Sequence, residues 1–277
     1  RTLFLSLPSF DSVADVKDGI NTGDNVRFMR FWWEINGGTI GQMKYWARFG
    51  KGDKSHRYHN PSQYVVRNSL SELRTLPGCR LMNTDFAFRS AVGFLSNSSS
   101  RFCAWLTPEG HLFCSTGGRS VFPGKIDQIS CVALMNSKLF GEMMGLINPT
   151  ITLKVGDVAS IPIPAEGLES LKESANIAVE LSNASWSEIE TSFGFLLPAR
   201  SCTDKSKRVK KLETLDATID AEVSRLYGLD GKDLAAINRE LNGAVEPAVE
   251  DDLTSGKAEE EEEADDLSSA DWSRSWI

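Results

Sequence analysis

The sequence lacks the long apolar run that a membrane-spanning helix needs, because polar residues interrupt even "CVALMNSKLFGEMMGLI" at 131–147. No charged-then-apolar signal peptide stands near Arg1, the first residue, and we expect a piece of a longer protein. Cysteine is also scarce: five occur in 277 residues, none of them in a CxxC pair. An odd number without such spacing favours reduced thiols, as in a cytoplasmic protein, over a disulfide framework.

Catalytic motifs are missing as well. The sequence contains no GxxxxGK[ST] loop, no GxSxG turn, no HExxH and no Asn-Pro-Pro-Tyr; its two Asn-Pro steps, "NPSQY" and "NPTI", lack the second proline. His56 and His59 are three residues apart, but no Cys or carboxylate ligand pair is near them, so we expect a solvated loop there and no metal site. The chain by itself therefore has no set of groups for covalent chemistry.

A net positive charge is lacking too, since 30 Lys and Arg stand against 38 Asp and Glu, a balance of −8. The two parts of the chain differ, however. Residues 1–157 hold 18 basic against 12 acidic side chains, whereas residues 158–277 hold 12 against 26, with a run of acids at 259–266. The balance of +6 in the first part leaves nucleic-acid binding open there, and the acidic surplus belongs to the second part.

Short β-type runs between Gly, Asn, Ser and Pro turns predict strands in the first part of the chain. We expect these strands within 63–70, 79–95, 101–116 and 151–164. The segment "TPEG" at 107–110 predicts a hairpin turn, because Pro108 presets one dihedral and Gly110 permits a positive φ.

Helical spacing first appears between Ile129 and Leu146, and Pro149 should end that helix. From about residue 166 the pattern is helical, with candidates at 167–190 and 205–229. The second candidate carries an apolar stripe that ends at Gly228. The stripe consists of Val209, Leu212, Leu215, Ile219, Val223 and Leu226. We expect it to dock on its own domain, the commoner arrangement, with a helix-pairing seam as the alternative.

Residues 244–270 hold too few apolar side chains for a core, which predicts disorder. The following "DWSRSWI" at 271–277 adds two tryptophans, as either a docking peptide or a tail folded back on its own body. These changes predict an α+β protein with three regions. They are a mixed β/α domain at 1–165, a helical region at 166–243 and an acidic flexible tail at 244–277.

The segment "KYWARFGKGDKSHRYHN" at 44–60 interleaves cations with aromatic side chains. Its cations can pair with phosphates and its glycines let a backbone approach closely, so it is typical of a nucleic-acid-binding loop. The five cations are Lys44, Arg48, Lys51, Lys54 and Arg57. A solvated loop with two buried aromatics is the alternative. A weaker candidate, "NSSSRFCAW", offers Ser98, Ser100 and Arg101 as hydrogen-bond donors.

The segment "INTGDN" at 20–25 predicts a tight structural turn. Gly23 suits a positive φ, and Thr22, Asp24 and Asn25 can close the turn through hydrogen bonds between side chains and backbone. We expect the two tryptophans that follow, at positions 32 and 33, to serve as packing.

The stretch "GINTGDNVRFMRFWWEI" at 19–35 resembles the Gly-[Ile/Leu]-x-Thr-Gly-x-Asn-x-x-Phe segment that opens the target-recognition region of large N6-adenine DNA methyltransferases, most of all the PglX type of BREX phage-defence systems. A second stretch, 134–164, resembles that family's Leu-x-Asn-Ser-Lys helix, Asn-Pro-Thr turn and Gly-Asp strand, which restriction–modification specificity domains share. Two further matches, "SWSEIETSFGF" at 185–195 and "DWSRSWI", follow in the same order.

The sequence departs from the family where DNA contacts are expected. Residues 43–58 keep Lys51 and Gly52 but not the usual Trp-x-Pro-Tyr, Lys-Gly-Gly and Arg-Lys-Trp pattern, and within 83–102 only Phe86, Phe88 and Arg89 align. The recognised DNA sequence is therefore not readable from these residues.

The resemblance implies a target-recognition region that binds double-stranded DNA, with the S-adenosylmethionine-binding catalytic core before Arg1 in the full-length protein. The DNA-binding residues would be Thr22, Asn25, Lys44, Arg48, Lys51, Lys54, Arg57, Arg89, Ser98, Ser100 and Arg101. The helical region and tail would meet other BREX proteins, and no membrane is involved. Two alternatives stay open: a protein-interaction module without DNA contact, and the specificity region of a fused restriction–modification enzyme.

Overall fold

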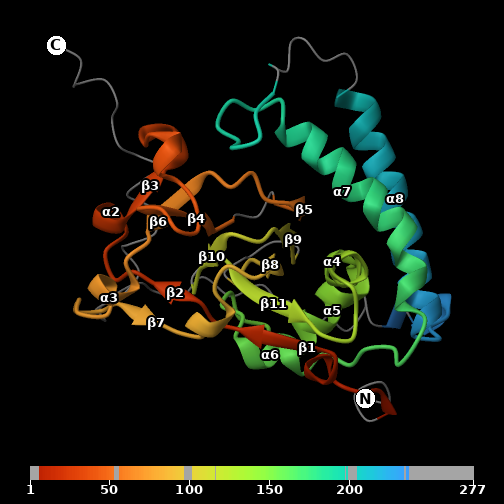
Figure 1. The fold of residues 1–277 in the computed structure, drawn as a ribbon. Coiled ribbons are helices and arrows are strands. Elements are labelled where there is room, and N and C mark those ends of the chain that lie inside the picture. Colours follow the sequence, from red (N-terminus) through yellow and green to blue (C-terminus); the bar gives the residue numbers. More distant parts are fainter. Residues whose placement is uncertain are drawn as a thin grey trace, which may run out of the picture.

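The computed structural model describes residues 6–52, 56–96, 102–115, 117–196, 198, 205–233 and 235–236. It has the expected α+β character, with two mixed sheets and helices packed beside them. Figure 1 shows helices α4, α5, α7 and α8 gathered on one side of the sheets, and the short helices α2 and α3 on the opposite side. Among the described residues, no helix combines the length and the apolar character of a membrane span.

The five-stranded sheet has the order β1-β11-β8-β9-β5. Its strands are β1 (Ala14–Lys17), β11 (Arg119–Pro123), β8 (Ala91–Phe94), β9 (Ala104–Thr107) and β5 (Tyr58–His59). All neighbours are antiparallel except β5 and β9, which run parallel. The main hydrophobic core lies between this sheet and the helices, and residues of β8, of α4 and of α8 all belong to it.

The four-stranded sheet has the order β10-β4-β6-β3. Its strands are β10 (His111–Phe113), β4 (Trp46–Gly50), β6 (Tyr64–Arg67) and β3 (Met29–Phe31). Alternate side chains of these strands, such as Met29, Ala47 and Val66, form a second, smaller core. Beside it lie a two-stranded sheet of β2 (Ile20–Asn21) and β7 (Arg80–Leu81), and the helices α2 (Asn25–Phe28) and α3 (Leu70–Leu73).

The predicted turn at 107–110 forms, and Gly110 has the expected positive φ of 85°. The predicted hairpin is wrong, because the strands on either side of the turn belong to different sheets. Strand β9 pairs with β8, whereas β10 pairs in parallel with β4. Turn residues such as Pro108 and Gly110 predict that the chain changes direction, but not which strands then pair. Here the chain crosses from the five-stranded sheet to the four-stranded sheet.

The strand predicted within 151–164 is also wrong, since its centre forms helix α6 (Val155–Ala159). Asp157 explains the start of this helix: its carboxylate accepts a hydrogen bond from the Lys154 N–H at 2.7 Å, a capping contact that a strand would not make. The single helix predicted from Ile129 to Leu146 is two, α4 (Gln128–Asn136) and α5 (Lys138–Ile147), because Ser137 is extended and caps α5.

The two C-terminal helices are confirmed as α7 (Lys172–Trp186) and α8 (Lys205–Leu226). Gly228, with a φ of 66°, follows the end of α8 as expected. Ile219 and Val223 of its stripe are buried in the main core, which is the docked arrangement. That core contains residues from both sides of the predicted boundary at 165/166. The tail predictions for 244–277 lie outside the described residues.

Five 3-10 turns complete the described structure. They are η1 (Phe10–Ser12), η2 (Trp32–Glu34), η3 (Gly37–Thr39), η4 (Thr84–Phe86) and η5 (Leu168–Leu171). Of these, η2 and η3 lie in the connection between β3 and β4.

Candidate nucleic-acid interface

The turn at 21–25 is held by its own side chains, as the sequence predicts. Gly23 has a φ of 70°, and its N–H donates to the Asn21 side chain at 3.0 Å. The Thr22 hydroxyl donates to Asn25 Oδ1 at 2.8 Å, and Asp24 caps helix α2 by accepting from the Arg27 N–H at 2.9 Å. Thr22 is only 2% exposed. These groups organise the chain locally, so Thr22 offers little surface to a ligand.

Strand β3 leads from this turn into an aromatic cluster. The Phe31 ring stacks on Trp33 at 4.5 Å and on Tyr64 at 5.2 Å between centroids. Trp32 packs edge-on against Phe193 at 5.4 Å, and its indole N–H donates to the Thr191 carbonyl oxygen at 2.9 Å. Trp33 packs on Phe31 and Trp32 but is not buried, since it is 43% exposed. Residues 191 and 193 contact Trp32, and part of the Trp33 side chain remains at the surface.

The predicted basic loop at 44–57 is mainly a strand. Strand β4 lies between β10 and β6, so the backbone of Arg48 is paired on both sides. The Arg48 guanidinium lies 3.7 Å from the centroid of the Phe193 ring, a cation–π contact, and burial lowers the pKa of Arg48. Lys51, just after the strand, lies 5.7 Å from the Tyr64 ring. These two cations therefore border the aromatic cluster.

The most exposed part of this region is the tip formed by residues 41–45, just before β4. Met43 is 91% exposed, and Lys44 and Tyr45 are also exposed. Asn68 holds the tip in place: its side-chain amide donates to the carbonyl oxygens of Gln42 at 2.6 Å and Lys44 at 3.0 Å. The tip thus presents a cation and an aromatic ring on a backbone that is hydrogen-bonded to the neighbouring segment.

Arg67 belongs with this tip, and sequence reasoning missed it. Its guanidinium lies 4.2 Å from the Tyr45 ring and pairs with Glu72 at 3.2 Å. The pairing of Trp46 with Arg67 in the sheet places Arg67 beside Tyr45. The only sequence signal was an arginine at the end of a predicted strand, and the contact depends on the register between β4 and β6.

Arg57 forms an ion pair with a carboxylate of helix α8. Its guanidinium forms an ion pair with Asp216 of α8, at 2.6 and 3.0 Å, and donates to the Asn136 carbonyl oxygen at 3.2 Å. The pKa of Arg57 is raised: burial lowers it, but the hydrogen bond and charge of Asp216 outweigh that effect. Arg57, just before β5, therefore ties this part of the chain to α8, and a phosphate would have to displace Asp216.

The predicted solvated loop at 56–59 is wrong. His56 is 2% exposed and lies edge-on to Trp186 at 5.1 Å, while His59 is part of β5. Burial, followed by the charge of His56, lowers the pKa of His59 to about 4. Within the described ranges, no group of three or more His, Cys, Asp or Glu is placed to hold a metal ion. These histidines therefore contribute to packing.

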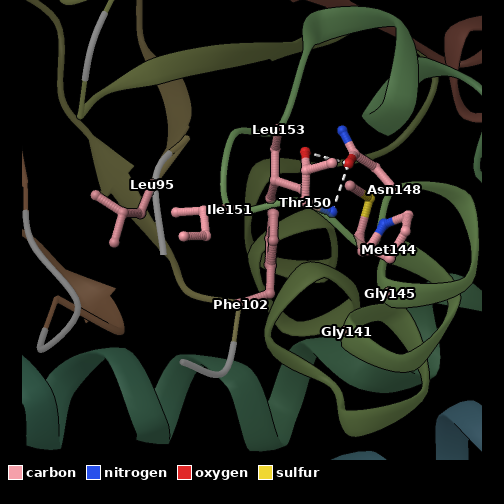
Figure 2. Close-up of a pocket in the computed structure, with 10 residues that line it drawn as sticks. Leu95, Phe102, Gly141, Met144, Gly145, Asn148, Thr150, Ile151 and Leu153 are labelled. Atoms are coloured by element: carbon pink, nitrogen blue, oxygen red, sulfur yellow. Dashed lines mark hydrogen bonds between the residues drawn. The ribbon is translucent and has the colours of Figure 1, made fainter. Parts of the chain in front are cut away.

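The remaining predicted contacts lie away from the tip or outside the described residues. Arg89 is exposed, 4.9 Å from the Phe86 ring. Lys54, Ser98, Ser100 and Arg101 lie outside the described residues. A pocket of about 400 Å³ lies between Leu95, Phe102 and the turn after α5. In Figure 2, Thr150 and Asn148 line this pocket, and the Thr150 hydroxyl donates to Asn148 Oδ1 at 2.5 Å. Apolar side chains such as Leu95 and Phe102 line the pocket together with these polar groups.

Comparison with known proteins gives two curated relatives, while no protein-family model matches the chain. The chain is 24% identical over 202 residues to the adenine-specific methyltransferase PglX of Lacticaseibacillus casei (strain Zhang), a match that covers 66% of this chain and 17% of that protein. It is 31% identical over 203 residues to the adenine-specific methyltransferase BrxX of Escherichia coli O9:H4 (strain HS), covering 69% and 16%. The chain thus spans about a sixth of the length of these relatives.

Among solved structures, the chain is similar to the Type IIL restriction–modification enzyme MmeI in complex with DNA. The TM-score is 0.49 and the sequence identity is 12%, over 83% of this chain and 35% of that one.

Proposed function

We propose, from the premise that this chain is related to a region of the PglX-type adenine-specific methyltransferases of BREX systems, that it recognises the DNA target of such an enzyme. The relationship over about two thirds of the chain supports the family context. The DNA-binding role rests on the chemistry of one surface of the chain.

The observation that carries the proposal is the ordered tip at 41–45 with Arg67 beside it. Lys44 offers a charge for a phosphate, and the exposed ring of Tyr45 is stacked on the Arg67 guanidinium at 4.2 Å. Phosphate contacts supply most of the affinity in protein–DNA binding, and side chains held on a fixed backbone set the register on the duplex. Because Asn68 fixes the tip, little ordering would be needed on binding.

Arg48 and Lys51 would assist from the sheet, whereas Arg57 would not. Arg48 is partly covered by Phe193, and Lys51 lies beside Tyr64, so both are close to the aromatic cluster that includes the exposed Trp33. Arg57 already has a carboxylate partner. The proposed contact set is therefore Lys44, Tyr45, Arg48, Lys51 and Arg67.

Methyl transfer itself is assigned to another part of such an enzyme. The Asn-Pro-Pro-Tyr motif, which would orient the amino group of a flipped adenine, does not occur in this sequence. We propose that the intact protein uses S-adenosylmethionine outside these 277 residues, and that this chain chooses where the DNA is methylated.

A fluorescence-anisotropy titration tests the proposal. The chain is titrated with a labelled random-sequence duplex at several salt concentrations between about 50 and 200 mM. The affinity should fall steeply with salt, and Lys44→Gln should lower the slope of log K against log salt by roughly 0.9, the value for one phosphate contact. The matched control is Lys125→Gln, an exposed lysine beyond β11 on the other sheet, which should leave the slope unchanged.

Equal slopes for the wild-type chain and Lys44→Gln would remove the tip from the interface. Absence of binding at all salt concentrations would contradict DNA recognition by this chain alone. Repeating the titration with the full-length enzyme would then show whether the tip acts only beside its catalytic part.

A further inference from the structure

The tip at 41–45 carries an apolar side chain at its apex. The Lys44 N–H donates to the Gly41 carbonyl oxygen at 3.1 Å, which closes a β-turn with Gln42 and Met43 at its centre. Met43 is 91% exposed, the highest value among the exposed large apolar side chains of the described residues, and both of its neighbours are exposed as well. The apex thus presents an amide, a thioether and an ammonium group at successive positions.

Hydrogen bonds hold the backbone of this apex from both sides. The Asn68 side chain bonds to two carbonyl oxygens of the tip, and the Asn68 N–H donates to a third, that of Tyr45, at 2.9 Å. On the other side, the Gly41 N–H donates to the Trp46 carbonyl oxygen at 2.8 Å. A single exposed apolar side chain is common on protein surfaces, but Met43 stands on a backbone that these bonds fix. Binding through Met43 would therefore order little of the chain.

The segments that carry the tip are basic. Residues 35–72 contain six Lys or Arg and two acids. One of the acids, Glu72, pairs with Arg67 at 3.2 Å, and the other, Asp53, lies outside the described residues. Apart from Arg57, which is paired with a carboxylate of α8, the cations of this stretch that the structure describes border the tip or the aromatic cluster. A partner with a dense negative charge suits these surroundings.

A DNA duplex has phosphates on its outside and stacked, apolar base faces inside, so it can accept a cation and an apolar side chain from adjacent residues. We propose that Met43 is a wedge that enters the stack of bases at one step of the bound duplex, while Lys44 contacts a phosphate. Methionine is among the side chains that proteins insert between bases, which partly unstacks the step and kinks the duplex. This inference rests on the proposed DNA recognition, and it adds a residue that acts on the bases to a set of phosphate contacts.

The test compares two duplexes of the same random sequence, one fully paired and one with a single T·T mismatch, in anisotropy titrations of the full chain. A wedge enters a step that is already unstacked more easily, so the mismatched duplex should bind about tenfold more tightly. Met43→Ala should remove this preference and leave the salt slope unchanged, because it removes no charge. Met43→Leu keeps an apolar wedge and should keep the preference. The matched control is Met82→Ala, at a methionine that is 46% exposed just after β7, and it should change neither quantity.

The outcomes that overturn the wedge are distinct from the one that overturns DNA recognition. Equal affinity of the wild-type chain for the two duplexes, with a steep dependence on salt, would overturn the wedge and leave DNA recognition standing. A preference that survives Met43→Ala would mean that Met43 is not the wedge. Replacing thymine by uracil in the paired duplex should have no effect; a loss as large as that of Met43→Ala would mean that Met43 contacts a thymine methyl group in the major groove instead. Absence of binding to either duplex at any salt concentration would contradict DNA recognition by this chain and the wedge with it.

Discussion

The indole N–H of Trp32 donates to the carbonyl oxygen of Thr191 at 2.9 Å, across 159 positions of the sequence. Phe193, two residues further on, packs against the same indole and covers the guanidinium of Arg48. Residues 191–193 therefore pack against the segment that follows β3 and against Arg48 of β4. Two stretches that sequence comparison treats as separate motifs form one packed unit, and the position of Arg48 depends on both.

The first prediction concerns this contact. Trp32→Phe should lower the free energy of unfolding by about 1 kcal/mol, because it removes a hydrogen bond and shortens the ring that meets Phe193. Urea denaturation followed by circular dichroism measures the change. Trp33→Phe is the control, since the exposed Trp33 should change stability by less than about 0.5 kcal/mol. Equal effects of the two substitutions would mean that the contact with Thr191 contributes nothing.

The second prediction concerns the ion pair between Arg57 and Asp216. Its side chains are 25% and 16% exposed, so removing one partner leaves a largely buried charge. Asp216→Asn should destabilise the fold by about 2–3 kcal/mol, toward the lower end for a buried pair, because some water reaches these groups. The same unfolding assay measures it, with Glu213→Gln, an exposed carboxylate on α8, as the control.

A double-mutant cycle adds the sharper test of this pair. With Arg57→Gln already present, Asp216→Asn should cost much less than it does alone, since the two groups interact directly. Full additivity of the two substitutions would show that each contributes through other contacts, such as the bond from the Tyr58 hydroxyl to Asp216 at 2.6 Å.

The elements that could be predicted from the sequence are those set by local patterns. Helix α8 follows from its apolar stripe, and the turns at Gly23 and Gly110 follow from residues that tolerate positive φ. The apolar residues of 151–164 suit a strand and predict one. The Asp157 carboxylate instead caps the N-terminus of α6 and stabilises a helix there. An acidic residue three positions after the N-cap is a helix-start signal that the sequence contains.

The candidate site was less predictable, because it depends on contacts between distant segments. The basic side chains within 44–57 look equivalent in the sequence, but the structure gives them different surroundings. Lys44 is exposed at a tip, Arg48 is covered by Phe193 and Arg57 is paired with Asp216. Local periodicity carries no information about residues 150 positions away. Arg67 was missed for the same reason, since only the register between two strands places it beside Tyr45.

The third prediction concerns the turn at Gly23. A Cβ atom there would lie 2.7 Å from the backbone nitrogen of Cys79, and the φ of 70° is already unfavourable for alanine. Gly23→Ala should therefore destabilise the fold by about 2 kcal/mol or more, combining backbone strain of roughly 1–2 kcal/mol with the clash. Gly37→Ala is the control in thermal unfolding, because nothing lies within 4 Å of its added Cβ. A neutral Gly23→Ala would show that the turn can move away from Cys79.

The last prediction is a loss of stability in mild acid that depends on His111. Its Nδ1 lies 3.0 Å from the Pro108 carbonyl oxygen, which can only accept, so Nδ1 carries the proton and Nε2 accepts from the Ser62 hydroxyl at 3.0 Å. Burial, followed by the charge of Arg48, lowers the pKa of His111 to about 4. The unfolded chain has a histidine pKa near 6.5 and so binds more protons between these values. The stability is present above pH 6.5 and is lost as the pH falls toward 4.

Between pH 6.5 and 5.0 the loss from His111 should be about 2 kcal/mol, at roughly 1.4 kcal/mol per pKa unit, and His59 adds a loss of the same sign. Urea denaturation at pH 7.5 and 5.0 measures the sum. His111→Gln removes one of the two contributions, so the difference in unfolding free energy between the two pH values should shrink by about 2 kcal/mol, whatever its effect at pH 7.5. An unchanged difference would mean that His111 is protonated in the folded protein and that Ser62 has turned to accept its proton.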